Sequence, residues 1–382
     1  MKKIIGLIGW RGMVGSVLIQ RMKEEGDFNL IEPIFFSTSN IGKNSLSCSI
    51  FKNLEDAYNF ELLKKLPIIL TTYGSKYTDQ VYYKLRSLGW NGIWIDAASS
   101  LRMKEDSLII LDPINRSNID YSLRNNVKNY IGSNCTVSCI LLGLSGLINL
   151  NLIEWINCST YQAASGGGSN YMKELLIQFG QINNHIKNLL DKKFENILNI
   201  DRNVLNKQQD GSLFENNSDL KLAGNFIPWI DKDLETGFSN EETKIENEIN
   251  KILGLNNNNI ESSYSYKNKI KIESTCVRVG SLRCHGHSLL IKLKKNNLNI
   301  QYIENLISHG NNYVKFVTNN KKETLDQLTP VKVTGTLNIS VGRLRKSKIG
   351  ERYLSMFIVG DQLLWGAAEP LRRMLKIILQ DS

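Results

Sequence analysis

The first 22 residues of the chain predict a strand, a glycine-rich turn and a helix, in that order. Residues 4–9 (Ile-Ile-Gly-Leu-Ile-Gly) have the apolar pattern of a buried strand, and residues 16–22 carry apolar side chains at helical spacing. Between them, Gly9, Gly12 and Gly15 form a G-x-x-G-x-x-G turn, which differs from the usual G-x-G-x-x-G spacing. Such a turn places backbone amides at a helix N-terminus, where a diphosphate binds. The segment therefore predicts an α/β fold with a dinucleotide-binding domain.

Further strand–helix units extend this pattern to about residue 133. Strands are predicted at 30–36, 67–73 and 92–96, with a helix at 78–88. Ligands of an open parallel sheet bind beyond the carboxyl ends of its strands, and the segment 96–102 lies at such an end. Its Arg102 offers a fixed fork of donors to a phosphate or carboxylate. A surface arginine is the alternative.

The segment after the second strand indicates which dinucleotide binds. An NAD-selective site has an acid there to hold the ribose 2′-hydroxyl. This chain instead has Ser37-Thr38-Ser39-Asn40, with Lys43 close behind. Hydroxyl groups and a cation suit a 2′-phosphate, so the sequence favours NADP.

Cys135 is the candidate nucleophile. It follows Gly132-Ser-Asn and precedes the apolar run 137–150, which predicts a loop that leads into the first turn of a buried helix. Helix N-terminal amides and the helix dipole lower the pKa of a thiol. The same amides can hold an oxyanion on a carbonyl attached to the sulfur. A buried structural cysteine is the alternative.

The middle of the chain adds a second set of candidates. A strand is predicted at 155–164, a flexible glycine turn at 162–168 and a helix at 172–190. Ser239-Asn-Glu-Glu242 predicts a capping box that opens a helix. On that helix Glu241 and Lys244 are three residues apart and share a face, as in an ordinary solvated ion pair.

Residues 274–295 alternate like one strand, and His285 and His287 fall on the same face of it. Either histidine is a candidate general base for thiol chemistry, and a structural histidine is the alternative for each. Cys284 lies beside them, but no second ligand pair has a recognisable spacing, so no metal site is predicted. Residues 359–379 predict a long amphipathic helix that docks on the first domain.

Length and composition set broad limits. A chain of 382 residues predicts two domains, and 42% hydrophobic with 22% charged residues is ordinary for a globular protein. The apolar run 137–150 is too short to cross a bilayer, and no signal-peptide pattern is seen, which favours a cytoplasmic protein. The six cysteines contain no Cys-x-x-Cys pair and are expected to be thiols.

The net charge of +10 raises the alternative of a nucleic-acid-binding protein. The lysines are scattered, however, and no basic helix or aromatic–basic strip stands out. A moderate positive field also suits anionic small molecules. Neither a nucleic-acid partner nor a membrane partner is therefore expected.

Several motifs occur together, in one order, from end to end of the chain. They are Gly9-Trp-Arg-Gly-Met-Val-Gly15, Phe35-Phe-Ser-Thr-Ser39, Asp96-Ala-Ala-Ser-Ser-Leu-Arg-Met103, Gly132-Ser-Asn-Cys-Thr-Val137, Tyr161-Gln-Ala-Ala-Ser-Gly-Gly-Gly168, Cys276-Val-Arg-Val-Gly280, Leu282-Arg-Cys-His285 and Gly360-Asp-Gln-Leu-Leu-Trp-Gly-Ala-Ala-Glu-Pro-Leu-Arg-Arg373. In this combination the sequence resembles the bacterial aspartate-semialdehyde dehydrogenase family.

The resemblance implies a homodimeric enzyme of the aspartate pathway to lysine, threonine, methionine and diaminopimelate. It would use NADPH to convert L-aspartyl-4-phosphate reversibly to L-aspartate 4-semialdehyde and inorganic phosphate, through a thioester on Cys135. The implied fold is α/β, with an N-terminal doubly wound, Rossmann-type NADP domain and a mixed α+β catalytic and dimerisation domain. The expected boundaries are 1–133 with 357–382, and 134–356.

The resemblance also implies roles for individual residues. Cys135 would be the nucleophile, His285 the general acid/base, and Gln162 would orient the substrate near the thiol. Arg278 would bind the substrate α-carboxylate and Glu241 its ammonium group, while Arg102 and Lys244 would hold phosphate. The NADP site would be lined by Arg11, Gly12, Met13, Val14, Thr38, Ser39, Tyr73, Ser165, Gly166, Gly167, Gly168, Ser169 and Gln362.

The chain departs from the family pattern in three places. Tyr73 stands where the pattern has a glutamine at the cofactor edge, and Lys193 replaces a proline near the cofactor. The Asn-rich stretch 254–269 is expected to be a peripheral insertion.

Two alternative functions stay open. One is a related acyl-phosphate reductase such as N-acetyl-glutamyl-phosphate reductase, whose substrate has no free ammonium group for Glu241. The other is a catalytically silent NADP-binding regulator.

Overall fold

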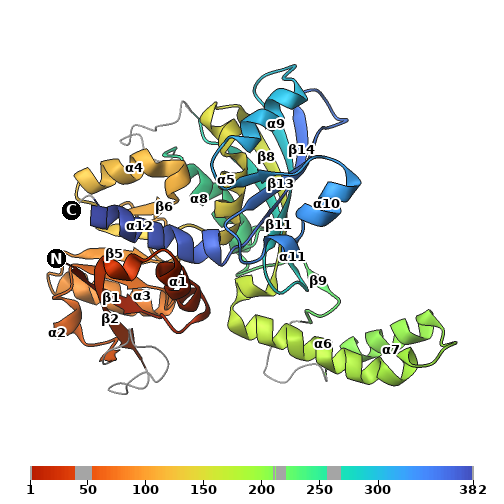
Figure 1. Cartoon of the computed structure of the whole chain (residues 1–382), viewed down its shortest axis with the longest axis horizontal. Coiled ribbons are helices and arrows are strands. Elements are labelled where there is room, and N and C mark those ends of the chain that lie inside the picture. The colour runs from red at the N-terminus through yellow and green to blue at the C-terminus, as the bar shows by residue number, and fades with distance from the viewer. Residues whose placement is uncertain (1, 39–53, 210, 212–220, 256–267, 381–382) are drawn as a thin grey trace.

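The computed structural model describes residues 2–38, 54–209, 211, 221–255 and 268–380, in which two seven-stranded sheets are packed side by side (Figure 1). The first sheet contains β1 (Lys3–Ile8), β2 (Ile31–Ser37), β3 (Glu55–Asp56), β4 (Ile68–Thr71), β5 (Ile93–Asp96), β6 (Ser107–Ile110) and β7 (Asn129–Gly132). Its helices are α1 (Met13–Glu24), α2 (Phe60–Leu63), α3 (Ser75–Ser87) and α4 (Asp112–Arg124), with a 3-10 turn at Asp27–Asn29.

The first sheet is parallel throughout, in the order β3-β2-β1-β4-β5-β7-β6. Its strands are buried on both faces. One face packs against α1, α4 and the C-terminal helix, and the other against α2 and α3. The strand order reverses direction at β1 and β4, as in a doubly wound sheet, and this confirms the predicted fold class.

The second sheet is mixed, in the order β12-β13-β14-β11-β8-β10-β9. Its strands are β8 (Ile153–Gln162), β9 (Phe226–Ile227), β10 (Lys271–Val279), β11 (His285–Leu293), β12 (Val314–Phe316), β13 (Ile339–Lys346) and β14 (Tyr353–Gly360). The helices of this part are α5 (Cys135–Asn149), α6 (Ser169–Leu190), α7 (Ile197–Gln209), α8 (Asn240–Ile252), α9 (Ile300–Ser308), α10 (Lys321–Gln327) and α11 (Pro330–Val333), whereas the last helix, α12 (Glu369–Gln380), packs on the first sheet.

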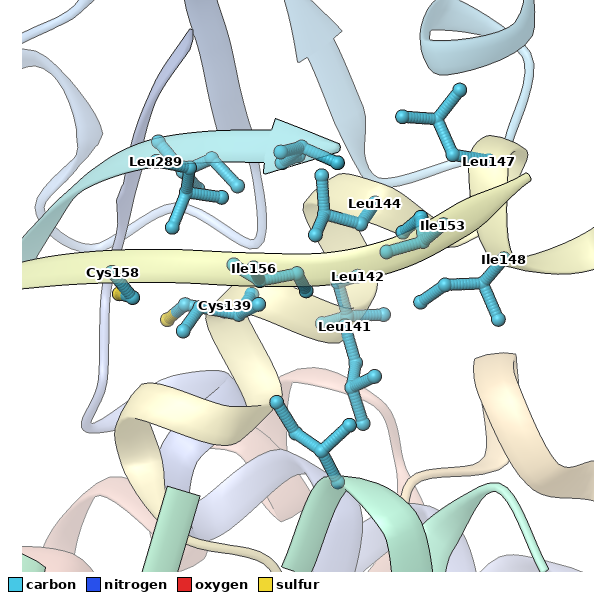
Figure 2. Close-up of a cluster of buried hydrophobic side chains, with 14 of the residues drawn as sticks. Cys139, Leu141, Leu142, Leu144, Leu147, Ile148, Ile153, Ile156, Cys158 and Leu289 are labelled. Atoms are coloured by element: carbon cyan, nitrogen blue, oxygen red, sulfur yellow. The ribbon is translucent and has the colours of Figure 1, made fainter. Parts of the chain in front are cut away.

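Helix α5 is the structural centre of the molecule. It leaves the carboxyl end of β7 in the first sheet and packs its apolar side chains under β8 and β11 of the second (Figure 2). Residues 136–148 are all buried, because the helix is covered by the second sheet, α8 and α9. A helix that is apolar all round is stable only in such a position. The first residue of α5, Cys135, therefore lies where the two halves of the chain meet.

The predicted strand 274–295 is in fact two strands. β10 pairs in parallel with one edge of β8, and β11 pairs antiparallel with the other edge. The chain must therefore cross the end of β8 between residues 280 and 284, where Cys284 adopts a positive φ of 72°. Alternation of apolar residues continues through this crossing, so the pattern alone did not reveal the turn.

The C-terminal segment also differs from the prediction of one helix over 359–379. Residues 359–360 end β14, a π-helical turn follows at Leu364–Ala368, and only then does α12 begin. The carboxylate of Asp361 holds the intervening turn by accepting from the amides of Leu363 (3.1 Å) and Gly335 (2.7 Å). Helix α12 packs on the first sheet, as expected, and brings the chain back beside α1 (Figure 1).

Candidate active site

The nucleophile candidate lies at the start of α5, directly after β7. The N-cap residue is Asn134, whose Oδ1 accepts from the amides of Thr136 (2.8 Å) and Val137 (3.3 Å). Asparagine is among the preferred N-cap residues because its side chain satisfies these amides. Two of the amides expected near the sulfur are thus already bonded to the neighbouring side chain.

A cavity of about 320 Å³ opens beside Cys135. Segments from both halves of the chain line it, including the loop after β5, the start of α5, the ends of β8 and β10, and α8. The lining residues are Arg102, Asn134, Cys135, Gln162, Gly166, Ile230, Asp231, Glu241, Lys244, Arg278 and Gly366. Six of the seven residues expected at the thiol or the substrate therefore line one cavity. The seventh, His285, contacts Cys135 beside the cavity.

His285 is hydrogen-bonded at both ring nitrogens. Its Nδ1 accepts from the amide of Ala163 at 3.1 Å, so the neutral ring carries its proton on Nε2. Nε2 lies 3.4 Å from Cys135 Sγ. Burial, the nearby His287 and the charge of Arg278 lower the pKa of His285 well below its usual 6.5. At neutral pH the ring is therefore uncharged and presents an N–H to the sulfur.

The second histidine candidate occupies a different place. His287 lies two residues further along β11 and is fully buried, with its ring 6.4 Å from that of His285. Neither of its ring nitrogens has a hydrogen-bond partner among the described residues, and burial lowers its pKa to about 3. Of the two histidines, only His285 contacts the sulfur.

The pKa of Cys135 is higher than the sequence suggested. Burial raises the pKa of this thiol to about 11, and the Glu241 carboxylate adds to the rise. Arg278, Arg102 and the Thr136 amide oppose it without cancelling it. The expectation of a lowered pKa is wrong for the free chain, because loss of water around the sulfur outweighs the helix terminus and the nearby cations.

The remaining charged groups of the cavity are held in fixed positions. Glu241 accepts from Asn134 Nδ2 at 2.9 Å and from Gln162 Nε2 at 3.4 Å. Lys244 pairs with Asp231 and lies 3.7 Å from the Glu241 carboxylate. The capping box at Ser239 that begins this helix is confirmed.

The two arginines of the cavity are buried and partly bonded to backbone carbonyls. Arg278 donates from Nη1 to Ala163 O at 2.8 Å, and its guanidinium lies 6.0 Å from the ring centroid of Tyr171. Arg102 donates from Nε to Gly132 O at 2.7 Å. Such bonds fix the planar guanidinium groups while part of each fork faces the cavity.

A glycine in the π-helical turn makes room for the sulfur. A Cβ on Gly366 would lie 2.4 Å from the Cβ of Cys135, a distance that real atoms do not adopt. Any larger residue at this position would displace Cys135. No local sequence pattern predicts this contact, since 230 residues separate the two positions.

The glycine turn of the first domain forms a tight cradle. Gly9 has a φ of 77°, and a Cβ on Gly15 would lie 2.2 Å from the carbonyl oxygen of Gly9. Gly12 is the N-cap of α1, whose first residues are Met13 and Val14. Only glycines allow the strand and helix to approach this closely, which is what a diphosphate-binding turn requires.

The other residues expected at the cofactor fall into two groups. On the first-domain side, Arg11 donates to Ser37, and Thr38 Oγ1 lies 2.6 Å from the hydroxyl of Tyr73. Tyr73 thus contacts the segment that replaces the usual acid. Ser39 and Lys43 lie outside the described residues, as does most of the Asn-rich stretch.

On the second-domain side, the turn 165–169 is split between two surroundings. Ser165 is buried and accepts from Gln362 Nε2, while Gln362 Oε1 accepts from the amide of Cys284 at 2.9 Å. Gly166 faces the cavity, since a Cβ there would lie 2.6 Å from Arg278 Nη1. Gly167 ends the 3-10 turn, Gly168 has a φ of 101°, and Ser169 begins α6.

Comparison with known proteins identifies the family of this chain. Residues 4–122 match the semialdehyde dehydrogenase NAD-binding domain, and residues 144–365 match the semialdehyde dehydrogenase dimerisation domain. The aspartate semialdehyde dehydrogenase of Francisella tularensis is 43% identical, with a TM-score of 0.92 over 98% of this chain and 99% of that one. The chain belongs to the aspartate-semialdehyde dehydrogenase family.

More distant members share the fold. The aspartate semialdehyde dehydrogenase II of Vibrio cholerae is 20% identical, with a TM-score of 0.77 over 100% of this chain and 99% of that one. A structure of the Candida albicans enzyme with NADP is 15% identical, with a TM-score of 0.65 over the same shares. The family's two-domain architecture is therefore retained at low identity.

Sequence reasoning missed several residues of this family member's cavity. Asn134, Asp231 and Gly366 line it, as does Ile230. Asn134 was detectable in principle, because an asparagine directly before a helical cysteine predicts an N-cap. The others reach the cavity only through the tertiary fold.

In the described residues no three His, Cys, Asp or Glu side chains cluster as a metal site. No helix in the described part of the chain is long and apolar enough to cross a membrane.

Proposed function

We propose that this enzyme reduces L-aspartyl-4-phosphate to L-aspartate 4-semialdehyde with NADPH, reversibly, through a thioester on Cys135. The observation that carries the proposal is the 3.4 Å contact between Cys135 Sγ and His285 Nε2 at a cavity lined by both acidic and basic groups. The 43% identical relative is named for this activity. Attack by a thiolate divides a difficult displacement into two easier steps.

The first requirement is to generate the thiolate. Glu241 raises the pKa of Cys135, so an ammonium group bound to Glu241 would remove part of that effect. The substrate amino group is such a cation. Glu241 would therefore both bind the substrate and couple its arrival to ionisation of the nucleophile. The thiol proton would pass to solvent water in the cavity, because Nε2 of the neutral His285 already carries a proton and Nδ1 accepts from Ala163.

The second requirement is to hold the reacting groups. Arg102 and Lys244 supply positive charge for the phosphate that leaves in one direction and attacks in the other. Gln162, whose amide is bonded to Glu241 and Thr160, orients the acyl group near the sulfur. His285 donates through Nε2 to the oxygen that gains negative charge on the acyl carbon.

The third requirement is a site for the cofactor. The cradle at Gly9, Gly12 and Gly15, which any Cβ would fill, fits a dinucleotide diphosphate, and the hydroxyls of Thr38 and Tyr73 favour NADP. Arg11, Met13, Val14, Ser39, Gln362 and residues 165–169 are proposed to line the same site. The bound cofactor supplies the hydride that reduces the thioester.

The deciding assay is phosphate-dependent reduction of NADP by purified protein with aspartate semialdehyde. We expect turnover with this aldehyde and at least tenfold less with N-acetyl-glutamate semialdehyde, because only the first carries an ammonium for Glu241. Preference for the acetylated substrate would favour the alternative reductase, and no turnover with either would favour the silent regulator.

Replacing Arg278 by leucine tests the substrate carboxylate site. Loss of one partner of a desolvated charge pair costs about 2–5 kcal/mol, so kcat/KM for the aldehyde is expected to fall by roughly 30- to 5,000-fold. Lys271, an exposed cation on the same strand, is the matched control, and Lys271→Leu is expected to keep normal kinetics. A loss below tenfold in Arg278→Leu would show that this arginine is structural.

We further propose that two chains associate through the second domain. The matched dimerisation domain covers 144–365. Within it, α6 and α7 project from the body of the molecule (Figure 1), and large apolar side chains are exposed there, including Phe194 (93% exposed) between the two helices and Ile197 (69%) at the start of α7. Tyr161, near the end of β8, is 42% exposed and packs on Phe357. Exposed large apolar side chains within the matched dimerisation domain support an interface in this part of the chain.

Sedimentation of the purified protein tests this association. The expected mass is twice the chain mass of 43.4 kDa. A single-chain mass at micromolar concentration would contradict the homodimer. The division into 1–133 with 357–382 and 134–356, the cytoplasmic location and the pathway to lysine, threonine, methionine and diaminopimelate stay predictions.

A further inference from the structure

Helix α8 carries four charged side chains on one face. Glu241, Lys244, Glu248 and Lys251 are spaced three or four residues apart, so they form a single row. The first two line the cavity, and Lys251 donates to the carbonyl oxygens of Arg102 and Lys104, each at 2.6 Å. Glu248 lies between them and has no part in the chemistry described so far.

Glu248 is bonded to two separate segments of the site. Its Oε1 accepts from Arg102 Nη1 at 3.0 Å, and its Oε2 accepts from the backbone amide of Asn134 at 2.7 Å. Both partners are donors, so both carboxylate oxygens are used as acceptors. Burial raises the pKa of Glu248, and the Arg102 charge and the Asn134 amide oppose that rise.

This carboxylate is almost fully buried, with 1% of the residue exposed. A buried carboxylate is costly unless it is paired and hydrogen-bonded, and removing one partner of such a pair is strongly unfavourable. The arrangement therefore fixes both partners as well as the acid itself. Asn134 is held a second time, by Glu241, through its side chain.

Each partner of Glu248 leads directly into the reaction centre. Arg102 is the cation assigned to the phosphate, and Asn134 is the residue before the nucleophile and the N-cap of its helix. Glu248, on a helix of the second domain, thus joins Arg102 on the phosphate side of the cavity to Asn134 on the thiol side.

We propose that Glu248 is a positioning residue that fixes the distance between Arg102 and Cys135. Phosphate bound at Arg102 would then lie within reach of the acyl carbon attached to the sulfur. The inference rests on the proposed function and deepens it. Misplacement of reacting groups by about 1 Å lowers rates by roughly 10²-fold. A residue that sets this distance therefore affects both phosphate affinity and turnover, without contacting the substrate.

The test compares Glu248→Gln with Glu246→Gln on the same helix. Glu246 is not among the described residues that line the cavity. In Glu248→Gln one acceptor oxygen becomes an NH₂ group that must face a donor, either Arg102 or the Asn134 amide. The apparent KM for inorganic phosphate is expected to rise at least tenfold and kcat to fall by about 10²-fold. The KM for NADP is expected to stay within twofold, and Glu246→Gln is expected to match the wild type throughout.

A second readout is independent of turnover. Inorganic phosphate is expected to slow alkylation of Cys135 by iodoacetamide, and the phosphate concentration for half-protection is expected to rise at least tenfold in Glu248→Gln. If that variant does not fold, Glu248→Asp serves instead, because it keeps the charge but lacks the reach to bond both partners.

The outcomes separate the two proposals. Wild-type phosphate KM and wild-type protection in a folded Glu248 variant would overturn the positioning role. Similar rises in the KM values for phosphate and for NADP, together with a fall in thermal stability, would also overturn it, since they indicate a purely structural residue. A wild-type protein that reduces no NADP with aspartate semialdehyde and phosphate would count against the proposed function itself.

Discussion

Cys135→Ala is expected to lower turnover by more than about 10⁴-fold while leaving NADP affinity within twofold of the wild type. We expect this loss because the sulfur is the proposed carrier of the acyl group, while the neighbouring His285 is buried, uncharged and bonded at Nδ1. The glycine cradle follows β1, whereas Cys135 follows β7 of the same sheet, and the cavity beside the sulfur is not lined by the cradle glycines. Steady-state kinetics with aspartate semialdehyde and a fluorescence titration with NADPH measure the two quantities.

The matched control is Cys139→Ala, one helical turn further along α5. Cys139 is a fully buried thiol that packs against Gly360, whereas Cys135 is partly exposed to the cavity. Its truncation is expected to cost about 1 kcal/mol or more of stability and to keep activity. Activity within tenfold of normal in a purified Cys135→Ala protein would exclude this nucleophile.

The pKa of about 11 adds a pH dependence to this expectation. Iodoacetamide reacts with the thiolate, so below pH 11 the alkylation rate of the free enzyme is expected to rise tenfold per pH unit. A plateau already reached at pH 8 would show that the thiol is ionised without substrate.

His285→Ala is expected to lower kcat by about 10²- to 10⁴-fold, the usual range for loss of a positioned proton-transferring group. His285→Gln is expected to lose less, because a glutamine amide can place an N–H near the position of Nε2. Since burial holds the pKa of His285 far below 6.5, no ionisation of this residue is expected in the kcat profile between pH 6 and 8. Kinetics of both variants across that pH range measure these effects.

His287→Gln is the matched control for this prediction. It changes a buried histidine on the same strand that does not contact Cys135, and its activity is expected to stay within tenfold of normal. A larger loss in His287→Gln than in His285→Ala would reverse the assignment of the two histidines.

Local sequence signals were sufficient where short-range physics decides the structure. The strand, glycine turn and helix at 4–22 were correctly predicted, since only glycines permit the contact between Gly15 and the Gly9 carbonyl. The capping box at Ser239 was also found from four consecutive residues. By contrast, the alternation across 274–295 concealed a crossing over the end of β8, because a period of two is the same on both sides of a turn.

The sequence by itself determined the family, the α/β class and the presence of a cysteine at the start of a buried helix, because each depends on neighbouring residues or on motifs in a fixed order. Only the tertiary structure decided the raised pKa of that cysteine, the contact of its sulfur with His285 rather than His287, and the contacts that Glu248 and Gly366 make at the cavity. These depend on burial and on contacts between residues more than 100 positions apart. Desolvation and packing are set by the whole fold, so no local pattern encodes them.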